Sequence, residues 1–315
     1  MKLHQLRALV AIADTGSIRN AARAAGLSPS AITKAIRELE DDLNLVLIVR
    51  EASGVTLTVA GHTLLGHARL TVAQLTRARQ EMERLSGQRY ATLSVAVVSW
   101  VALTLLGDVV NLFQTRMPGV KLEFFEGLAT ITMPKLRDGT LELSIGRAAT
   151  TYVDEFAHVP LFRTGYAVVS RAGHRLAGCR SLHELSDAEW ILNRDSFIDE
   201  AVENNAFSEY HRLHQPRIHI SHSSAIAIGL VATTDMLTLM PWPLAEQIMS
   251  KEDLSVLPIV DSIAESEVNL IYRRSAPLSQ AAKCFIECLT STIHASMDSD
   301  ESRKRRLFHS VECLL

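Results

Sequence analysis

The sequence predicts an α/β protein built from three parts, because its hydrophobic periodicity changes twice along the 315 residues. The first part has two short helices and a hairpin, and the second is one long helix. In the third part, strands alternate with helices, which is typical of sheets covered by helices. With 47% hydrophobic and 21% charged residues, the chain has the composition of a globular protein with ordinary cores.

The segment "AARAAGLSPSAITKAIRELE", residues 21–40, predicts two helices joined by a tight turn. Its alanines favour a helix that ends at Gly26, because glycine readily adopts the left-handed conformation found at helix C-termini. Ser28 can cap the next helix with its hydroxyl, and Pro29 suits the first helical position. The apolar residues of this second helix recur at helical spacing: Ile32, Ile36 and Leu39. This pattern is typical of a helix-turn-helix, whose second helix reads the major groove of DNA.

A short β-hairpin is predicted directly after the second helix. Apolar residues alternate on both sides of the turn "EASG": Leu45, Leu47 and Val49 before it, and Val55, Leu57 and Val59 after it. A hairpin in this place forms a wing, where Arg50 at the base and Ser53 at the tip are expected to contact the DNA backbone or the minor groove. We therefore assign residues 1–60 to a winged helix-turn-helix domain.

A long helix is predicted from about residue 60 to residue 85. Its apolar residues lie three and four apart: Leu75, Ala78, Met82 and Leu85. This seam suits a dimer, so we assign residues 61–88 to a linker and dimerisation helix that ends near Ser86 and Gly87. The alternative is an amphipathic helix packed on its own domain, because the seam has fewer clean heptads than a coiled coil requires.

Beyond the linker, the strands "TLSVAVVS", "VKLEFFEG" and "LELSIG" alternate with helices in a βαβαβ pattern. A second group runs from "GYAVVSR" to "MLTLMP", and "EVNLIYRR" with a final helix closes the domain. The pattern predicts mostly parallel sheets covered on both faces, with ligands bound outside the carboxyl ends of the strands. Two such halves would enclose a cleft.

Charge and composition limit the function further. The net charge of −3 conceals an asymmetry, since residues 1–90 hold 12 Lys and Arg against 8 Asp and Glu, while the remainder holds 20 against 27. Phosphate contacts are therefore expected in the N-terminal part. No apolar run is long enough for a membrane span, and the N-terminus does not resemble a secretory leader, so we expect a cytoplasmic protein. The four cysteines form no CxxC pair, which indicates neither a disulfide framework nor a zinc finger.

Residues 6–50, "LRALVAIADTGSIRNAARAAGLSPSAITKAIRELEDDLNLVLIVR", and the following "GVTLTVAG" resemble the N-terminal domain of LysR-type transcriptional regulators. The resemblance implies a two-lobed effector domain similar to periplasmic binding proteins, which we place at residues 89–297. Lobe I would comprise 89–163 and 265–297, and lobe II 164–264. The tail 298–315, "DSDESRKRRLFHSVECLL", has no family counterpart, and we expect it to be disordered and solvated.

The resemblance also implies partners: double-stranded DNA, a small-molecule effector, and further copies of the chain in a dimer or a tetramer. RNA polymerase is a further candidate partner, and no cofactor is expected. The sequence departs from the family in two places, having Pro29-Ser30 where Gln-Pro is usual and Asn44 where Gly is frequent. Contacts usually made by that Gln would then fall to neighbouring residues of the second helix.

The motif and the resemblance together assign ten residues to DNA contact: Ser17, Arg19, Ser28, Pro29, Ser30, Thr33, Lys34, Arg37, Arg50 and Ser53. Lys34 can donate to guanine O6 and N7, and Thr33 can meet a thymine methyl group. Arg37 and Arg50 are expected to contact phosphates. Each cation could alternatively be a solvated surface charge, which the helix-turn-helix context makes the weaker interpretation.

Four hydroxyls are predicted at the cleft, because each follows a strand and begins a helix: Ser99, Thr130, Ser223 and Ser224. Backbone N–H groups at helix N-termini attract anions, so a small carboxylate is expected there. Three residues are expected to cover the apolar part of a carboxylate or aromatic effector: Trp100, Leu128 and Phe197. Each hydroxyl could equally be a simple helix cap.

Two other classes of protein fit the sequence less well. An enzyme is disfavoured because the sequence has no GxSxG, HExxH, P-loop or GxGxxG motif. The histidines of "HRLHQPRIHISH", namely His211, His214, His219 and His222, have near-ligand spacing, but the pattern divides them between a helix end and a strand, so no metal site is expected. A solute-binding protein for transport would explain two lobes but not the first 90 residues.

Overall fold

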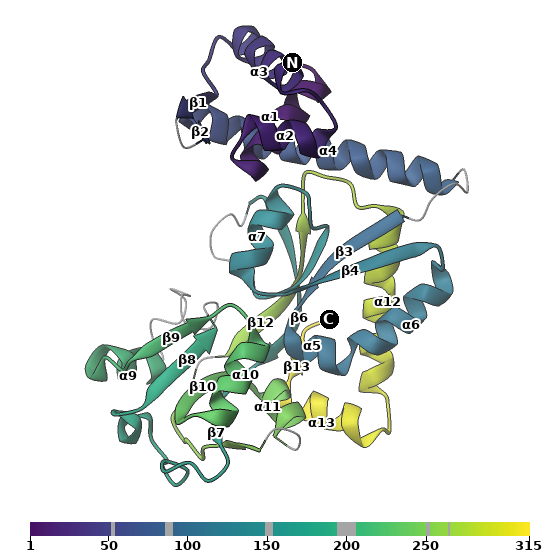
Figure 1. The fold of residues 1–315 in the computed structure, drawn as a ribbon. Coiled ribbons are helices and arrows are strands. Elements are labelled where there is room, and N and C mark those ends of the chain that lie inside the picture. Colours follow the sequence, from purple (N-terminus) through teal and green to yellow (C-terminus); the bar gives the residue numbers. More distant parts are fainter. Residues whose placement is uncertain (52–53, 86–90, 149–153, 194–205, 250–252, 264) are drawn as a thin grey trace. The chain divides into compact units, whose positions relative to one another are not determined.

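The computed structural model describes residues 1–51, 54–85, 91–148, 154–193, 206–249, 253–263 and 265–315 (Figure 1). The chain divides into two compact units. The first is Met1–Ala91 with Lys135–Leu141, and the second is Thr92–Pro134 with Glu142–Leu315. No helix among the described residues is both long and apolar enough to cross a bilayer.

The N-terminal unit consists of helices and one hairpin in the predicted order. Its elements are α1 (Leu3–Thr15), α2 (Ile18–Ala25), α3 (Pro29–Leu43), β1 (Ile48–Glu51), β2 (Gly54–Leu57) and α4 (Val59–Leu85). The strands β1 and β2 pair antiparallel, which confirms the predicted wing. The helix α4 begins at Val59, which the sequence pattern had assigned to the hairpin.

The turn between α2 and α3 has the predicted chemistry. Gly26 ends α2 with a φ of +65°, a conformation that costs glycine little. Ser28 Oγ accepts a hydrogen bond from the N–H of Ala31 at 3.2 Å, and Pro29 is the first residue of α3. The core beneath this turn is formed by fully buried side chains of three helices: Leu9, Ile12, Ala21, Ile32, Ile36 and Leu39.

The wing is held to the helices by hydrogen bonds between side chains and backbone groups. Glu40 of α3 accepts hydrogen bonds from the N–H groups of Leu47 and Ile48, at 2.8 and 3.2 Å. Thr58 Oγ1 donates to the carbonyl of Val46 at 2.7 Å and accepts from the N–H of Gly61 at 3.0 Å. These bonds fix the start of α4 against the segment that enters β1.

The second unit contains two sheets. The first has the order β13-β6-β12-β5-β3-β4 and the second β11-β7-β10-β8-β9. The strands of the first sheet are β3 (Ala91–Val97), β4 (Val120–Glu126), β5 (Leu143–Gly146), β6 (Phe156–Thr164), β12 (Ser266–Arg273) and β13 (Glu312–Cys313). Those of the second are β7 (Tyr166–Arg171), β8 (Glu189–Asn193), β9 (Ile218–Ser221), β10 (Met236–Pro241) and β11 (Leu254–Val256).

Both sheets are mixed, so the expectation of mostly parallel sheets is only partly right. β3 pairs parallel with β5, and β8 pairs parallel with β9 and β10. β12 pairs antiparallel with β5 and β6, and β7 pairs antiparallel with β10 and β11. The antiparallel pairs arise because β6 passes through Gly165 into β7, and β12 brings the chain back into the first sheet.

Helices of the second unit connect and cover these strands. They are α5 (Ser99–Thr104), α6 (Leu106–Arg116), α7 (Ala129–Arg137), η1 (Leu182–Leu185), α9 (Ala206–His214), α10 (Ser224–Thr233), α11 (Trp242–Ile248), α12 (Gln280–Met297) and α13 (Ser302–Ser310). α6 packs on α12 through the buried rings of Phe113 and Phe285, whose centroids lie 5.6 Å apart.

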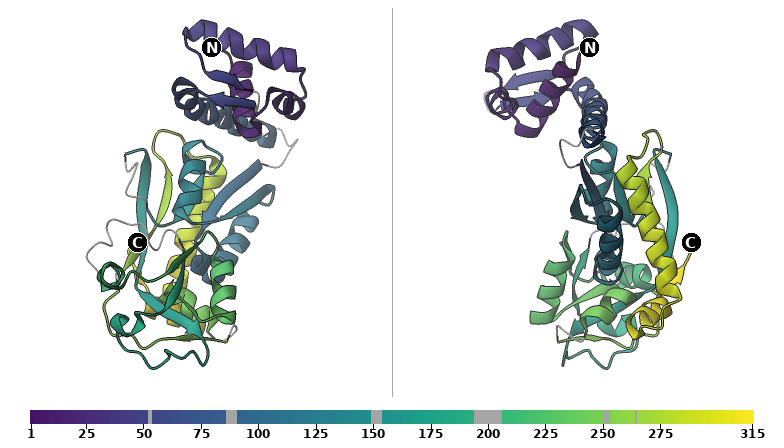
Figure 2. Two further views of the ribbon diagram at one scale, coloured as in Figure 1. Left: turned by 60° about the vertical axis from the view of Figure 1, so that its left-hand side comes forward. Right: turned by 90° about the vertical axis from the view of Figure 1, so that its right-hand side faces the viewer.

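The prediction of a disordered tail after residue 297 is wrong. The helix α13 packs against α12 and α11, and β13 adds to the edge of β6 (Figure 2). Leu307 is 2% exposed, and Phe308 lies against Phe162 with ring centroids 6.5 Å apart. Lys304, within the basic run, pairs with Asp108 at 3.2 Å. Burial of the tail's few apolar residues therefore outweighs the polarity of its sequence.

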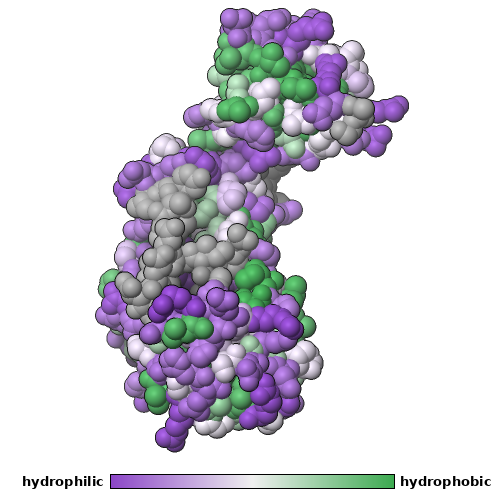
Figure 3. All heavy atoms as spheres, turned by 90° about the vertical axis from the view of Figure 1, so that its left-hand side faces the viewer, coloured by the Kyte–Doolittle hydropathy of each residue, from purple (hydrophilic) through white to green (hydrophobic). Residues whose placement is uncertain are grey.

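The surface of the N-terminal unit is partly apolar. In Figure 3, apolar residues gather among polar ones on the face of this unit that the view shows. Large apolar side chains of the unit that are exposed include Leu45, Val46, Val59, Leu75 and Met82. Contiguous exposed apolar surface in a folded protein often marks an interaction site.

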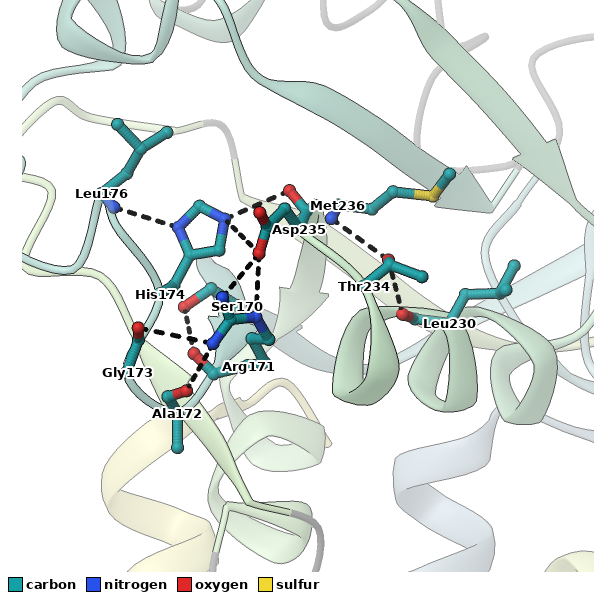
Figure 4. Close-up of polar contacts among 10 residues, drawn as sticks. All are labelled: Ser170, Arg171, Ala172, Gly173, His174, Leu176, Leu230, Thr234, Asp235 and Met236. Atoms are coloured by element: carbon teal, nitrogen blue, oxygen red, sulfur yellow. Dashed lines mark hydrogen bonds and ion pairs between the residues drawn. The ribbon is translucent and has the colours of Figure 1, made fainter.

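A polar cluster in the second sheet is structural (Figure 4). Arg171 pairs with Asp235 at 2.7 Å, and this contact holds the pKa of the Asp235 carboxyl below its usual value. The buried His174 accepts a hydrogen bond from the N–H of Leu176 at Nδ1, so its Nε2 donates to the carbonyl of Asp235 at 3.1 Å. These bonds fix the turn after β7 to the start of β10.

Candidate DNA-reading helix and effector pocket

The helix α3 presents one buried and one exposed face. Ile32, Ile36 and Leu39 face the core, whereas Ser30, Lys34 and Arg37 are exposed. The Lys34 side chain is 78% exposed, and its nearest acid is Glu38, with an Nζ–Oε1 distance of 3.9 Å. An exposed pair at this distance contributes little, so the ammonium group remains available to another anion.

The other predicted DNA-contacting residues lie on or beside α2, α3 and β1, except for Ser53. Ser17 precedes α2 and Arg19 lies exposed in its first turn, while Ser28 and Pro29 begin α3. These four residues thus stand at the N-termini of α2 and α3, where backbone N–H groups suit phosphate contacts. Thr33 is half-buried, and Arg50 is exposed on β1. Ser53 lies outside the described residues.

Only some of the predicted effector residues lie together in the structure. A pocket between the two sheets has a volume of about 60 Å³. Four of the seven predicted residues line it: Ser99, Trp100, Leu128 and Ser224. Trp100 is 2% exposed and packs edge-on against Phe162, with centroids 5.1 Å apart.

Of the remaining three predicted residues, two do not line the pocket and one lies outside the described residues. Thr130 is exposed on α7 and is not among the lining residues. Ser223 precedes α10, but its hydroxyl does not cap that helix and does not line the pocket. Phe197 lies outside the described residues. The prediction for Thr130 fails because its helix begins at Ala129, one residue before the threonine.

Sequence reasoning missed five polar residues of the pocket: Glu126, Arg147, Tyr166, Asn193 and Ser266. Glu126 Oε1 accepts a hydrogen bond from the backbone N–H of Ser224 at 2.8 Å. Ser99 Oγ lies 3.1 Å from the same oxygen and 2.8 Å from Ser224 Oγ. A carboxylate of the chain therefore already occupies the helix N-terminus at which the sequence predicted an effector carboxylate.

The remaining polar contacts come from both sheets. Asn193 Nδ2 donates to Ser224 Oγ at 3.2 Å, and Arg147 Nη1 donates to the Tyr166 hydroxyl at 3.3 Å. One signal could have identified Glu126, namely its place at the end of the strand "VKLEFFE" directly before Gly127. The strand ends meet closely there, because the N–H of Gly127 donates to the carbonyl of Val97 at 2.9 Å.

The described residues contain no cluster of three or more His, Cys, Asp or Glu that could hold a metal ion. The histidines fall where the sequence pattern placed them. His211 and His214 lie at the end of α9, His219 lies on β9, and His222 follows that strand. His214 instead contacts His183, with Nε2 and Nδ1 2.9 Å apart.

Family models match both parts of the chain. The model of the LysR-family bacterial regulatory helix-turn-helix matches residues 3–62, and that of the LysR substrate-binding domain matches residues 86–293. The HTH-type transcriptional regulator TdcA of Escherichia coli is 24% identical over 279 residues, which cover 87% of each chain. The regulator PcaQ of Agrobacterium fabrum is 26% identical over 291 residues, covering 89% of this chain and 92% of its own.

Solved structures show the same fold. The crystal structure of CbnR, a LysR family transcriptional regulator, aligns with a TM-score of 0.65 at 21% identity, covering 93% of this chain and 99% of that one. Full-length CbnR in complex with its target DNA aligns with a TM-score of 0.61, also at 21% identity, covering 93% of this chain and all of that one. These relatives are regulators, and the enzyme alternative has no support among them. The two matching family models establish that the chain belongs to the LysR family of DNA-binding transcriptional regulators, with an effector-binding domain after its helix-turn-helix.

Proposed function

We propose that this regulator binds a promoter-proximal inverted repeat as a dimer and responds to a small molecule held in the pocket between the two sheets. The observation that supports the first part is the exposed polar face of α3, a helix whose N-terminus is capped by Ser28. In a helix-turn-helix dimer, each recognition helix enters one major groove, and the half-site centres lie on one face of the duplex. This function would be exercised in the cytoplasm, where the chromosome lies.

The long helix α4 supports a dimer. Leu75 is 44% and Met82 is 59% exposed, although both are large apolar residues on one face of the helix. A partner helix that covered them would remove apolar surface from water. The apolar seam is shorter than that of a long coiled coil. A tetramer and a contact with RNA polymerase are separate proposals.

The pocket supports a small effector with a carboxylate or an aromatic group. Trp100, Leu128 and Leu244 supply apolar walls, and Arg147 supplies a positive charge. An effector that binds one arrangement of the lobes more tightly shifts the population toward it. Such a shift would alter the DNA bend or the contact with the transcription machinery.

Leu75→Glu tests the proposed dimer. A carboxylate placed in an apolar dimer seam should cost several kcal/mol of dimer stability. We expect the variant to sediment as a smaller species and to bind an inverted-repeat operator at least about tenfold more weakly. Analytical ultracentrifugation and gel-shift titration measure the two effects.

The matched control is Thr76→Glu, which adds the same charge at an exposed position beside the seam. The control should keep both dimerisation and operator affinity. If Leu75→Glu bound the operator as tightly as the wild type, the dimer seam would have to be placed elsewhere.

A further inference from the structure

The carboxylate of Glu126 can accept further hydrogen bonds in the pocket. Its Oε1 already accepts from the Ser224 N–H, with Ser99 Oγ 3.1 Å away. Among the described residues, no hydrogen-bond donor is recorded for Oε2, and no cation lies within ion-pair distance of the carboxylate. The side chain is half-buried, so a cation bound in the pocket would add charge compensation to the carboxylate.

A second acceptor in the same pocket is also unsatisfied. Asn193 donates to Ser224 Oγ through Nδ2, and its buried Oδ1 has no hydrogen-bond partner in the part of the chain that the structure describes. Buried polar atoms are nearly always paired, so this oxygen is able to accept a hydrogen bond from a ligand in the pocket. Glu126 and Asn193 can therefore both accept hydrogen bonds from a ligand. A positively charged donor group on that ligand would suit the Glu126 carboxylate.

The pocket also contains a positive charge. Among the lining residues that the structure describes, Glu126 carries the one carboxylate and Arg147 the one guanidinium group. Arg147, beside the Tyr166 hydroxyl, suits a carboxylate, because guanidinium groups bind carboxylates through paired N–H donors. The N-terminus of α10 cannot take that carboxylate, since Glu126 occupies it.

The size of the pocket limits the ligand. A volume of about 60 Å³ corresponds to a compound of few heavy atoms. The walls of Trp100, Leu128 and Leu244 favour a short apolar body between the polar ends.

We propose that the effector is a small zwitterion of the amino-acid class, with a protonated amine held by Glu126 and Asn193 and a carboxylate directed to Arg147. The proposal rests on the effector function proposed above for this pocket. It replaces the expectation of a simple carboxylate, because the carboxylate site at α10 is filled from within the chain.

The test is isothermal titration calorimetry of the full-length protein with each standard amino acid, followed by two analogues of the tightest binder. The analogues are the 2-hydroxy acid, which lacks the amine, and the primary amine, which lacks the carboxylate. We expect at least one small amino acid to bind, and both analogues to bind at least about tenfold more weakly, as expected when a charged hydrogen-bonding partner is lost.

Glu126→Gln keeps the shape of the side chain and removes its charge. We expect it to weaken amino-acid binding at least about tenfold. We also expect a smaller difference in affinity between the amino acid and its 2-hydroxy acid. A purely structural role of Glu126 would not produce this change in selectivity. The control is Glu123→Gln, on the same strand but exposed and outside the pocket lining, which should leave binding unchanged.

Operator binding separates the two proposals. If the 2-hydroxy acid bound as tightly as the amino acid, if Glu126→Gln left affinity and selectivity unchanged, or if no amino acid bound, the zwitterion proposal would be overturned. Retained operator binding in each of these cases would leave the regulator function standing. Loss of operator binding by the wild-type protein would overturn the proposed function itself.

Discussion

Gly61→Ala is expected to unfold the N-terminal unit under conditions in which the wild type is folded. A Cβ atom at position 61 would lie 2.1 Å from the carbonyl oxygen of Leu47, a backbone atom that cannot rotate away. The segment entering β1 and the first turn of α4 would have to separate. We expect a loss of more than about 3 kcal/mol in the stability of this unit and no detectable operator binding.

Gly66→Ala, on the same helix, is the matched control. A Cβ atom there meets nothing within 4 Å, so the substitution should stabilise α4 by up to about 1 kcal/mol. Hydrogen exchange of the full-length proteins measures the stability of each unit separately, and gel shift measures operator binding. Equal protection of the N-terminal unit in the two variants would contradict the close contact at position 61.

Gly127→Ala is expected to have an effect of similar size on the second unit. Its Cβ atom would lie 2.6 Å from the Val98 nitrogen, 2.7 Å from the Val97 carbonyl carbon and 2.9 Å from the Ile145 carbonyl oxygen. All three are backbone atoms of neighbouring strand ends, so the floor of the pocket would have to move. We expect a loss of more than about 3 kcal/mol in this unit and a loss of effector response.

The control for this position is Gly107→Ala on α6, where the space around an added Cβ is open. It should be neutral or slightly stabilising. Hydrogen exchange should show that Gly127→Ala loosens the second unit and leaves the N-terminal unit protected. A fully protected second unit in Gly127→Ala would mean that the strand ends are not as close as the structure shows.

The features predicted correctly from the sequence depend on neighbours along the chain. Gly26, Ser28 and Pro29 specify the turn of the helix-turn-helix through their own backbone preferences and one local hydrogen bond. The long helix α4 and the alternation of strands and helices follow from periodicity in the same way. These signals need no knowledge of the tertiary fold.

The features that were missed depend on distant contacts. Glu126 and Ser224 are 98 residues apart, and only the packed lobes bring that carboxylate to the start of α10. The tail was predicted to be disordered because it has no family counterpart, while its order comes from Leu307 and Phe308 packing on residues far away in the sequence. The antiparallel strands β6 and β12 likewise reflect the route of the chain between two sheets, which local patterns do not encode.

The most direct test of the central claim, that the exposed face of α3 reads an inverted repeat, is selection of bound duplexes from random DNA by the full-length protein. We predict an enriched inverted repeat whose half-site centres lie on one face of the duplex. Lys34→Ala should bind this repeat about 5- to 100-fold more weakly and relax base preference at symmetric positions. Lys121→Ala, which removes an exposed lysine from β4, should bind like the wild type. If no inverted repeat were enriched, or if Lys34→Ala bound it as tightly as the wild type in moderate salt, α3 would not be the element that reads DNA.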